Sequence, residues 1–226
     1  CVTAQLGLFK AAQWIEKGLA ESALVLSFDY VGPFVAAGFN SLKILNEQLP
    51  SPYSRRETGS IGLGDGIAWA ILDRNGDGPR IQAQALYNEM YHFTGNAPEG
   101  VGFSKTLSSL AEYLENSRFW IKGHGTGTLE AGRLEAEAAN RCFPGSPLVS
   151  WKGSIGHTLG SCALVELALA MAANEMGSIP ATIGTIGPCF SPDVATESFA
   201  AGQFEKVLLL SNAFGGAHGA MIIENA

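Results

Sequence analysis

Short apolar runs recur along the chain at the length expected of buried strands. Polar or Gly-rich segments separate them, and the last two flank a Gly-rich bend that predicts a closing strand pair. The segment 75–78, Asn-Gly-Asp-Gly, is a strong turn signal after the second run. The expected strands are 23–28, 67–72, 81–91, 119–122, 148–151, 207–210 and 220–224.

Between these runs, apolar residues repeat at helical spacing. Val2, Leu6 and Phe9 fall on one helical face, and Gly18 follows as a terminator. Because strands alternate with helices, we expect an α/β fold with a parallel or mixed sheet covered on both faces. The expected helices are 1–19, 105–116, 130–141 and 157–176.

The turn at 75–78 is the expected division between two parts of the chain, residues 1–78 and 79–226. The first predicted helix opens at residue 1, with no earlier strand to pair with the run at 23–28. In a layered α/β fold this arrangement predicts that an N-terminal portion is missing.

Composition excludes several classes of protein. The chain has 14 Lys and Arg against 21 Asp and Glu, a net charge of −7, so no basic stripe is available to neutralise nucleic-acid phosphates. No apolar run reaches the roughly 18 residues of a membrane span, and no signal peptide is visible. The four cysteines form no Cys-x-x-Cys pair. This disfavours a disulfide framework or a zinc site and makes a reducing cytoplasm the expected compartment.

Two histidines lie in small-residue loops that directly follow predicted strands. His124 lies in Gly-His-Gly-Thr-Gly-Thr, and His157 ends the segment Lys-Gly-Ser-Ile-Gly-His, which begins at Lys152. Open α/β sheets place their ligands at the ends of such strands, and glycine lets a substrate approach the backbone closely. The shared context favours a functional role for both histidines over a structural one.

Cys1 stands at the N-terminal end of the first predicted helix, where the helix dipole favours a thiolate. It is therefore a candidate nucleophile, although its position alone favours a buried structural cysteine. Cys142, Cys162 and Cys189 lie in apolar or loop segments with no base nearby in the sequence. We interpret these three as structural.

Several segments resemble, in order, the motifs of the β-ketoacyl synthases, the condensing enzymes of fatty-acid and polyketide synthesis. The stretch CVTAQLGLFKAAQWIEKGLAESALVLSFD is similar to the one that begins at the family's nucleophilic cysteine, and FVAAGFNSLKIL and GLGDGIAWAILD are similar to the segments that follow it. GHGTGTLEAGRLEAEA and SWKGSIGHTLGSCALVELALA resemble the two histidine segments of the family. SNAFGGAHGAMIIE resembles the C-terminal turn and last strand.

The resemblance implies a thiolase-like layered α/β/α fold with mixed sheets. It also implies a decarboxylating Claisen condensation, in which an acyl group on cysteine reacts with a malonyl thioester. Cys1 would carry the acyl group, and His124 and His157 would stabilise the enolate that forms as carbon dioxide leaves. Lys152 would set the charge and orientation around His157. Glu166 would be its buried partner or a structural anchor on the following helix.

The remaining roles that the resemblance implies concern the thioester substrate. The backbone N–H groups of Cys1 and Phe214 would form the oxyanion hole, and Phe214 would also gate the cavity. Thr126 and Thr128 would hydrogen-bond the phosphopantetheine arm of an acyl carrier protein, although both also fit as turn-capping residues. The resemblance implies no metal or redox cofactor, and the carrier protein delivers the phosphopantetheine arm. The expected assembly is a homodimer or a heterodimer with a related synthase subunit.

The C-terminal turn departs from the common family pattern SFGFGGTNG, because it reads SNAFGGAHG. Asn212, Ala217 and His218 are therefore substitutions. Asn212 and Ala213 are placed to reshape the acyl entrance, and we interpret His218 as a structural replacement for asparagine. These differences bear on substrate preference more than on the reaction.

Two alternatives stay open on the sequence. One is a non-catalytic subunit related to chain-length factors, which the set Cys1, His124 and His157 disfavours. The other is an N-terminal-cysteine amidohydrolase, which the alternation of strands and helices disfavours. A thiolase, which has the same overall fold, usually has a second catalytic cysteine near its C-terminal turn, and 212–219 contains none.

Overall fold

The computed structural model describes residues 1–45 and 47–225 and has a mixed α/β architecture. This confirms the fold class that the alternating patterns predicted. The helices are α1 (Thr3–Glu16), α2 (Pro33–Ser41), α3 (Val101–Ser108), α4 (Leu129–Cys142), α5 (Lys152–Ile155) and α6 (Cys162–Glu175). The strands are β1 (Ser22–Asp29), β2 (Gly66–Asp73), β3 (Arg80–Asn88), β4 (Phe119–Lys122), β5 (Leu148–Val149), β6 (Ser178–Ile179), β7 (Phe199–Ala200), β8 (Lys206–Ala213) and β9 (Ala217–Glu224).

The largest sheet has five strands in the order β3-β9-β8-β4-β5 and is mixed. β4 pairs in parallel with β5 and β8, whereas β8 and β9 are antiparallel neighbours joined by the Gly-rich turn. This pair is the predicted closing strand pair, with eight residues on each strand. β4 is buried along its whole length and has its predicted bounds.

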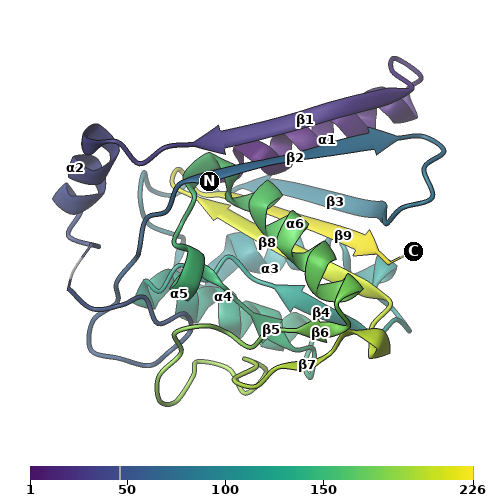
Figure 1. Ribbon diagram of the computed structural model, residues 1–226. Helices are drawn as coiled ribbons and strands as arrows, with labels where there is room; N and C mark the ends of the chain where they lie inside the picture. Colours follow the sequence, from purple (N-terminus) through teal and green to yellow (C-terminus); the bar gives the residue numbers. More distant parts are fainter. Residues whose placement is uncertain (46, 226) are drawn as a thin grey trace.

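Helices cover both faces of the five-stranded sheet (Figure 1). α1 and α6 pack between it and the β1-β2 sheet, and α3 and α4 lie on the opposite face. Leu208 and Leu210 of β8 enter the core that includes α3 and α4, and Val207 and Leu209 enter the core that includes α1 and α6. Because both faces are covered, β8 has a continuous apolar run rather than an alternating one.

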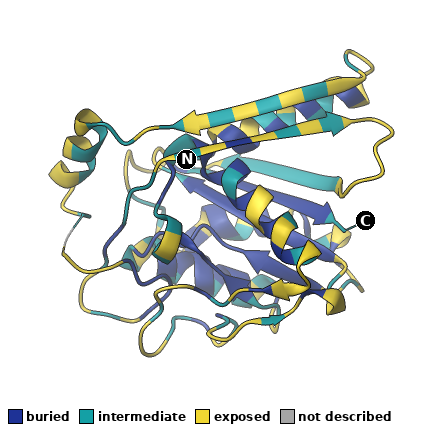
Figure 2. Cartoon of the chain, viewed as in Figure 1, coloured by how far each residue is buried: buried dark blue, intermediate teal, exposed yellow. Residues whose placement is uncertain are grey.

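β1 and β2 form a separate antiparallel sheet over α1, and its outer face is apolar. Figure 2 shows how exposed positions alternate with more buried ones along both strands. A contiguous apolar face of this kind marks a packing or interaction surface. Six large side chains on it are each more than half exposed and pair across the strands: Leu24 with Ile71, Leu26 with Trp69, and Phe28 with Ile67.

The predicted turn at 75–78 connects β2 to β3 and therefore connects two sheets. The β1-β2 sheet lies within 1–78, and the five-stranded sheet lies within 79–226. The division of the chain into two lobes at this turn stays a prediction. Among the residues described, no helix is both long and apolar enough to cross a membrane.

Several helix bounds differ from the predicted ones. The helix expected at 105–116 lies earlier, because Gly100 starts it with a φ of 65°, and a short 3-10 turn replaces its second half. The helix expected at 157–176 begins only at Cys162, because Gly156 and Leu159 have φ values of 72° and 52°. α2 was not predicted, since none of its residues is buried and its sequence shows no clear apolar face.

The two-sided packing of β8 predicts a large effect of truncation at its centre. Leu208 is fully buried, so Leu208→Ala is expected to lower the free energy of unfolding by about 2–5 kcal/mol. Leu19→Ala is the matched control, because Leu19 is 71% exposed, and its effect should stay within about 0.5 kcal/mol. Urea unfolding followed by tryptophan fluorescence measures both, and similar losses for the two variants would contradict this packing.

Candidate active site

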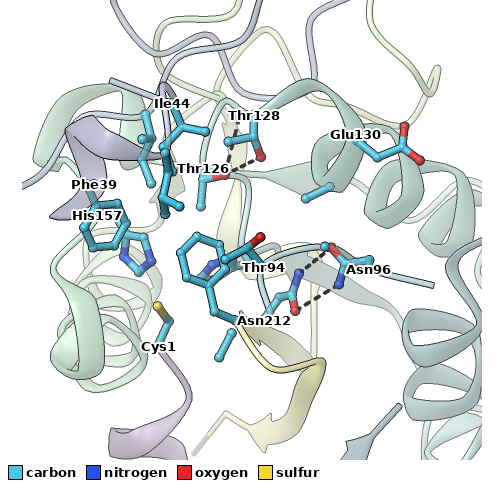
Figure 3. A pocket seen from close by; sticks show the side chains of 17 residues that line it. Cys1, Phe39, Ile44, Thr94, Asn96, Thr126, Thr128, Glu130, His157 and Asn212 are labelled. Carbon is cyan, nitrogen blue, oxygen red and sulfur yellow. Dashed lines mark hydrogen bonds between the residues drawn. The ribbon is translucent and has the colours of Figure 1, made fainter. Parts of the chain in front are cut away.

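A cavity of about 230 Å³ gathers six of the eight predicted site residues (Figure 3). Cys1 lies two residues before α1, and Phe214 directly follows β8. His124 and the two threonines come from the loop after β4, and His157 comes from the loop after α5. The six residues are Cys1, His124, Thr126, Thr128, His157 and Phe214. The remaining two, Lys152 and Glu166, are buried outside the cavity lining.

The two histidine rings contact each other edge to face. Their centroids are 5.1 Å apart and their planes are at 85°. Only 5% of His124 and 2% of His157 is exposed. Both rings therefore stand at one place in the cavity wall, although their loops come from different parts of the chain.

Backbone contacts fix the position of His157. Its N–H donates to the carbonyl of Gly62 at 2.7 Å, and its carbonyl accepts from the N–H of Gly64 at 3.2 Å. Gly156 has a φ of 72°, and a Cβ there would lie 2.8 Å from the carbonyl carbon of Leu63. The segment 62–64 therefore clamps this loop, and only glycine fits at position 156.

Burial keeps both histidines neutral. It lowers the pKa of His124 well below the ordinary 6.5, and the positive charge of Lys152 and the neighbouring His157 lower it further. The pKa of His157 is also well below 6.5, because of burial and then of Lys152. A neutral imidazole has one N–H donor and one acceptor nitrogen. At neutral pH the pair can therefore donate hydrogen bonds without carrying charge.

A buried ion cluster lies next to the histidines. The Glu166 carboxylate contacts the ammonium of Lys152 at 2.5 Å and that of Lys122 at 2.8 Å. Lys152 Nζ also donates to the carbonyl oxygen of His124 at 2.7 Å. Burial lowers the pKa of Lys122, whereas Glu166 offsets the burial of Lys152 and holds its pKa above the ordinary value.

Lys152 contacts His124 rather than the ring of His157. Its charge nevertheless acts on both rings, because it lowers the pKa of each. Glu166 is the ion-pair partner of Lys152, at the distance given above, and its side chain is 2% exposed. How these contacts act in a reaction stays a prediction.

A second carboxylate holds the loop after β4. Glu135 of α4 accepts hydrogen bonds from the N–H of His124 at 2.5 Å and of Gly125 at 2.9 Å. The hydroxyl of Tyr53 donates to the same carboxylate at 3.0 Å. Burial raises the pKa of Glu135, and these three donors resist that rise. The carboxylate therefore fixes the backbone that carries His124.

The other cavity residues lie around these groups. Phe214 is 46% exposed and stacks on Phe39 with ring centroids 5.9 Å apart. Thr126 Oγ1 and Thr128 Oγ1 are 3.0 Å apart. The buried thiol of Cys162 donates to the carbonyl oxygen of Cys1 at 3.1 Å, so this cysteine serves the backbone around the candidate nucleophile.

Among the residues of the site region that sequence reasoning missed are Lys122, Glu135, Tyr53 and Asn96. Lys122 ends an otherwise apolar strand, and a lysine there signals a buried charge that needs a partner. Glu135 faces inward on α4 beside buried Leu134 and Ala136. Nothing in the sequence around Tyr53 or Asn96 distinguishes them from ordinary loop residues.

A family model and two curated relatives all point to similarity with beta-ketoacyl synthases. Residues 80–185 match the model of the beta-ketoacyl synthase, C-terminal domain. The chain is 27% identical to the tetracenomycin polyketide synthase ketoacyl synthase alpha subunit of Streptomyces glaucescens, covering 85% of this chain and 50% of that protein. It is 26% identical to the actinorhodin polyketide putative beta-ketoacyl synthase 1 of Streptomyces coelicolor, covering 100% of this chain and 53% of that protein.

Solved structures share the fold. A beta-ketoacyl synthase from Burkholderia phymatum superposes with a TM-score of 0.89 at 20% identity, covering 100% of this chain and 60% of that one. A ketosynthase in complex with its chain length factor from Xenorhabdus doucetiae gives a TM-score of 0.90 at 24% identity, covering 100% of this chain and 58% of that one. The chain thus spans 50–60% of the length of these four relatives.

The layered α/β fold is the thiolase-like fold of these solved ketosynthases. Residues 80–185 match the C-terminal domain of the β-ketoacyl synthases, and the chain as a whole is similar to the C-terminal portion of these proteins.

The ion cluster predicts a pH-dependent loss of stability. Glu166→Gln removes the carboxylate shared by Lys122 and Lys152, and we expect a loss of about 3–5 kcal/mol near neutral pH. Burial already lowers the pKa of Lys122 below 10.5, and the variant lowers it further. Above that lowered pKa the unfolded state binds more protons, so the variant should regain stability as the pH rises toward 10.5.

Urea unfolding at about pH 7 and about pH 9 measures this effect. Glu137→Gln is the control, because Glu137 bonds Arg133 at 2.8 Å on the partly exposed side of α4. Its loss should stay below about 1 kcal/mol at both pH values. A loss for Glu166→Gln as small as the control's would show that the cluster does not contribute as argued.

Proposed function

We propose that the protein containing this chain is a β-ketoacyl synthase that joins an acyl group on Cys1 to a malonyl unit, with loss of carbon dioxide. The observation that carries this proposal is the convergence of Cys1, His124 and His157 on one cavity, with both imidazoles kept neutral. The matched relatives named as polyketide synthases favour a polyketide-type acyl chain over a fatty-acid one.

The first step is acyl transfer. The Cys1 thiolate attacks the thioester carbonyl, a C–S bond forms to Cys1, and the carrier thiolate leaves and takes up a proton. The developing oxyanion would accept hydrogen bonds from the backbone N–H groups of Cys1 and Phe214. Both residues border the cavity, which supports this assignment.

The second step is condensation. When the malonyl thioester loses carbon dioxide, the electrons of the broken C–C bond move onto the thioester oxygen as an enolate. Neutral His124 and His157 would donate hydrogen bonds to that oxygen, and Lys152 beside them adds a favourable positive potential. The enolate carbon then attacks the Cys1 thioester, a C–C bond forms, and the Cys1 thiolate is released.

Two kinds of partner follow from this chemistry. An acyl carrier protein would bring both thioesters, with Thr126 and Thr128 placed to bind its phosphopantetheine arm. A second synthase-related subunit would complete the assembly. Solved relatives described as a ketosynthase with its chain length factor, and as an acyl-carrier protein in complex with its ketosynthase, support these proposals.

Acyl transfer to Cys1 distinguishes a synthase from a chain-length-factor-like subunit. We expect the natural full-length protein to gain the mass of one acyl group after incubation with an acyl-carrier thioester. Cys1→Ser should lose at least about a thousandfold in transfer rate, because a hydroxyl without an activating base is a weak nucleophile. Cys189→Ser, which lies outside the cavity lining, should transfer at the normal rate. Labelling of Cys189→Ser and Cys1→Ser alike would exclude Cys1 as the nucleophile.

The two histidines should matter for decarboxylation more than for acyl transfer. We expect His124→Ala and His157→Ala each to lower carbon dioxide release from malonyl-carrier by about 10²–10³-fold, the effect of removing one donor to a developing oxyanion. Acylation of Cys1, measured by intact mass on the same samples, should change less than tenfold. Equal loss of both activities would indicate that the histidines only maintain the fold of the cavity.

A further inference from the structure

The cavity has a polar wall that the proposed reaction does not use. Asn96 and Asn212 both line it, and their side-chain amides face each other. Asn96 Nδ2 donates to Asn212 Oδ1 at 3.4 Å, and Asn212 Nδ2 donates to Asn96 Oδ1 at 3.3 Å. Asn212 is only 7% exposed. Such a buried amide pair costs free energy unless its polar atoms are satisfied.

The pair leaves hydrogen-bonding capacity unused. Each Asn amide has two N–H donors and an oxygen that can accept two bonds. Among the described residues, the structure gives each amide no side-chain partner other than the opposite amide. One N–H and one acceptor position on each side chain therefore stay available beside the cavity.

The side chain of Glu89 holds the loop that carries Asn96. The carboxylate of Glu89 accepts from the N–H of Ala97 at 2.8 Å and from that of Gly102 at 3.1 Å. The same carboxylate lies 3.4 Å from Nε2 of His218, whose side chain is 2% exposed. This contact gives His218 a structural environment, and His218 is not among the residues that line the cavity. Asn96 is thus presented by an anchored loop and Asn212 by a central strand.

The apolar side chains labelled in the cavity gather apart from most of the polar ones (Figure 3). Phe39 and Ile44 lie on the left of the view, near Cys1 and His157, whereas Asn96, Asn212, Thr126, Thr128 and Glu130 lie to their right. An acyl chain suits the first side. The second side suits a group that both donates and accepts hydrogen bonds, and a secondary amide is such a group.

We propose that Asn96 and Asn212 bind a secondary amide of the thioester's pantetheine arm, and so determine which thioesters the site accepts. The inference deepens the proposed function and depends on the same cavity. A keto group on the acyl chain would use only the donors of the pair, since a ketone accepts but does not donate. A secondary amide has one donor and one acceptor, so it can use a free acceptor and a free N–H of the pair together.

Binding of S-methylpantetheine tests the inference without any reaction. An NMR titration of the natural full-length protein gives its dissociation constant. Asn212→Leu and Asn96→Leu should each weaken binding by about tenfold, the effect expected of one or two lost neutral hydrogen bonds. Asn174→Leu is the matched control, because it breaks another amide contact, to Asn225 at 2.8 Å, away from the cavity lining, and it should bind normally.

Acylation kinetics then separate the amide from other groups. One acyl group is offered to Cys1 on pantetheine, on N-acetylcysteamine and on propanethiol, which carry two, one and no amides. We expect Asn212→Leu to raise the KM for the pantetheine thioester about tenfold and to leave the rate with the propyl thioester within about twofold. Asn212→Gln, which keeps the amide, should recover part of the lost affinity.

Each other outcome has a distinct meaning. An equal loss of acylation rate with all three thioesters would overturn the inference and indicate a packing role for the Asn96–Asn212 pair. The inference would also be overturned if S-methylpantetheine bound normally and the acylation rate fell only for acyl chains with polar substituents. That result would assign the pair to binding of the acyl group. Weakened S-methylpantetheine binding in a protein whose Cys1 is never acylated would support the amide site and contradict the proposed function.

Discussion

The carboxylate of Glu166 is the interaction on which the arrangement of the site depends, because two buried lysines from different elements share it. Lys122 ends β4, Lys152 begins α5, and Glu166 lies on α6 between the sheets. Each ammonium also donates to a carbonyl of the loop after β4, Lys122 to Gly123 and Lys152 to His124. The cluster therefore joins the sheet, the middle helix layer and both histidine loops. Apolar packing would stabilise such an interior at least as well, so we attribute the cluster to positioning and charge.

That charge has a direct chemical consequence. The ammonium of Lys152 donates to the carbonyl oxygen of His124, in an interior where water screens its charge little. Burial and this positive charge together disfavour protonation of His124 and His157. The same positive potential favours negative charge that develops on a substrate oxygen. A site that keeps its hydrogen-bond donors neutral and its background positive is suited to forming an enolate, and a site for protonating a leaving group would need the opposite.

The sequence predicted what depends on local pattern. β4 and the β8-β9 pair follow from continuous apolar runs, and Cys1, His124, His157 and Phe214 follow from small-residue segments whose order resembles a family. It did not predict contacts between segments far apart in the chain. The role of Lys122 is apparent only from its ion pair with Glu166, and that of Asn96 only from its hydrogen bonds with Asn212. The start of α6 was also missed, because the backbone of 62–64 pairs with His157 and a short 3-10 turn at Leu159–Ser161 precedes the helix.

The same dependence on distant contacts applies to the nucleophile. Cys1 lies two residues before α1, and α1 packs between the five-stranded sheet and the β1-β2 sheet. An isolated two-stranded sheet is marginally stable in water, and this one has an apolar outer face. The histidine loops depend instead on the five-stranded sheet and its ion cluster. Covering the outer face of β1 and β2 would therefore stabilise the support of α1, and with it the position of Cys1 relative to the two imidazoles.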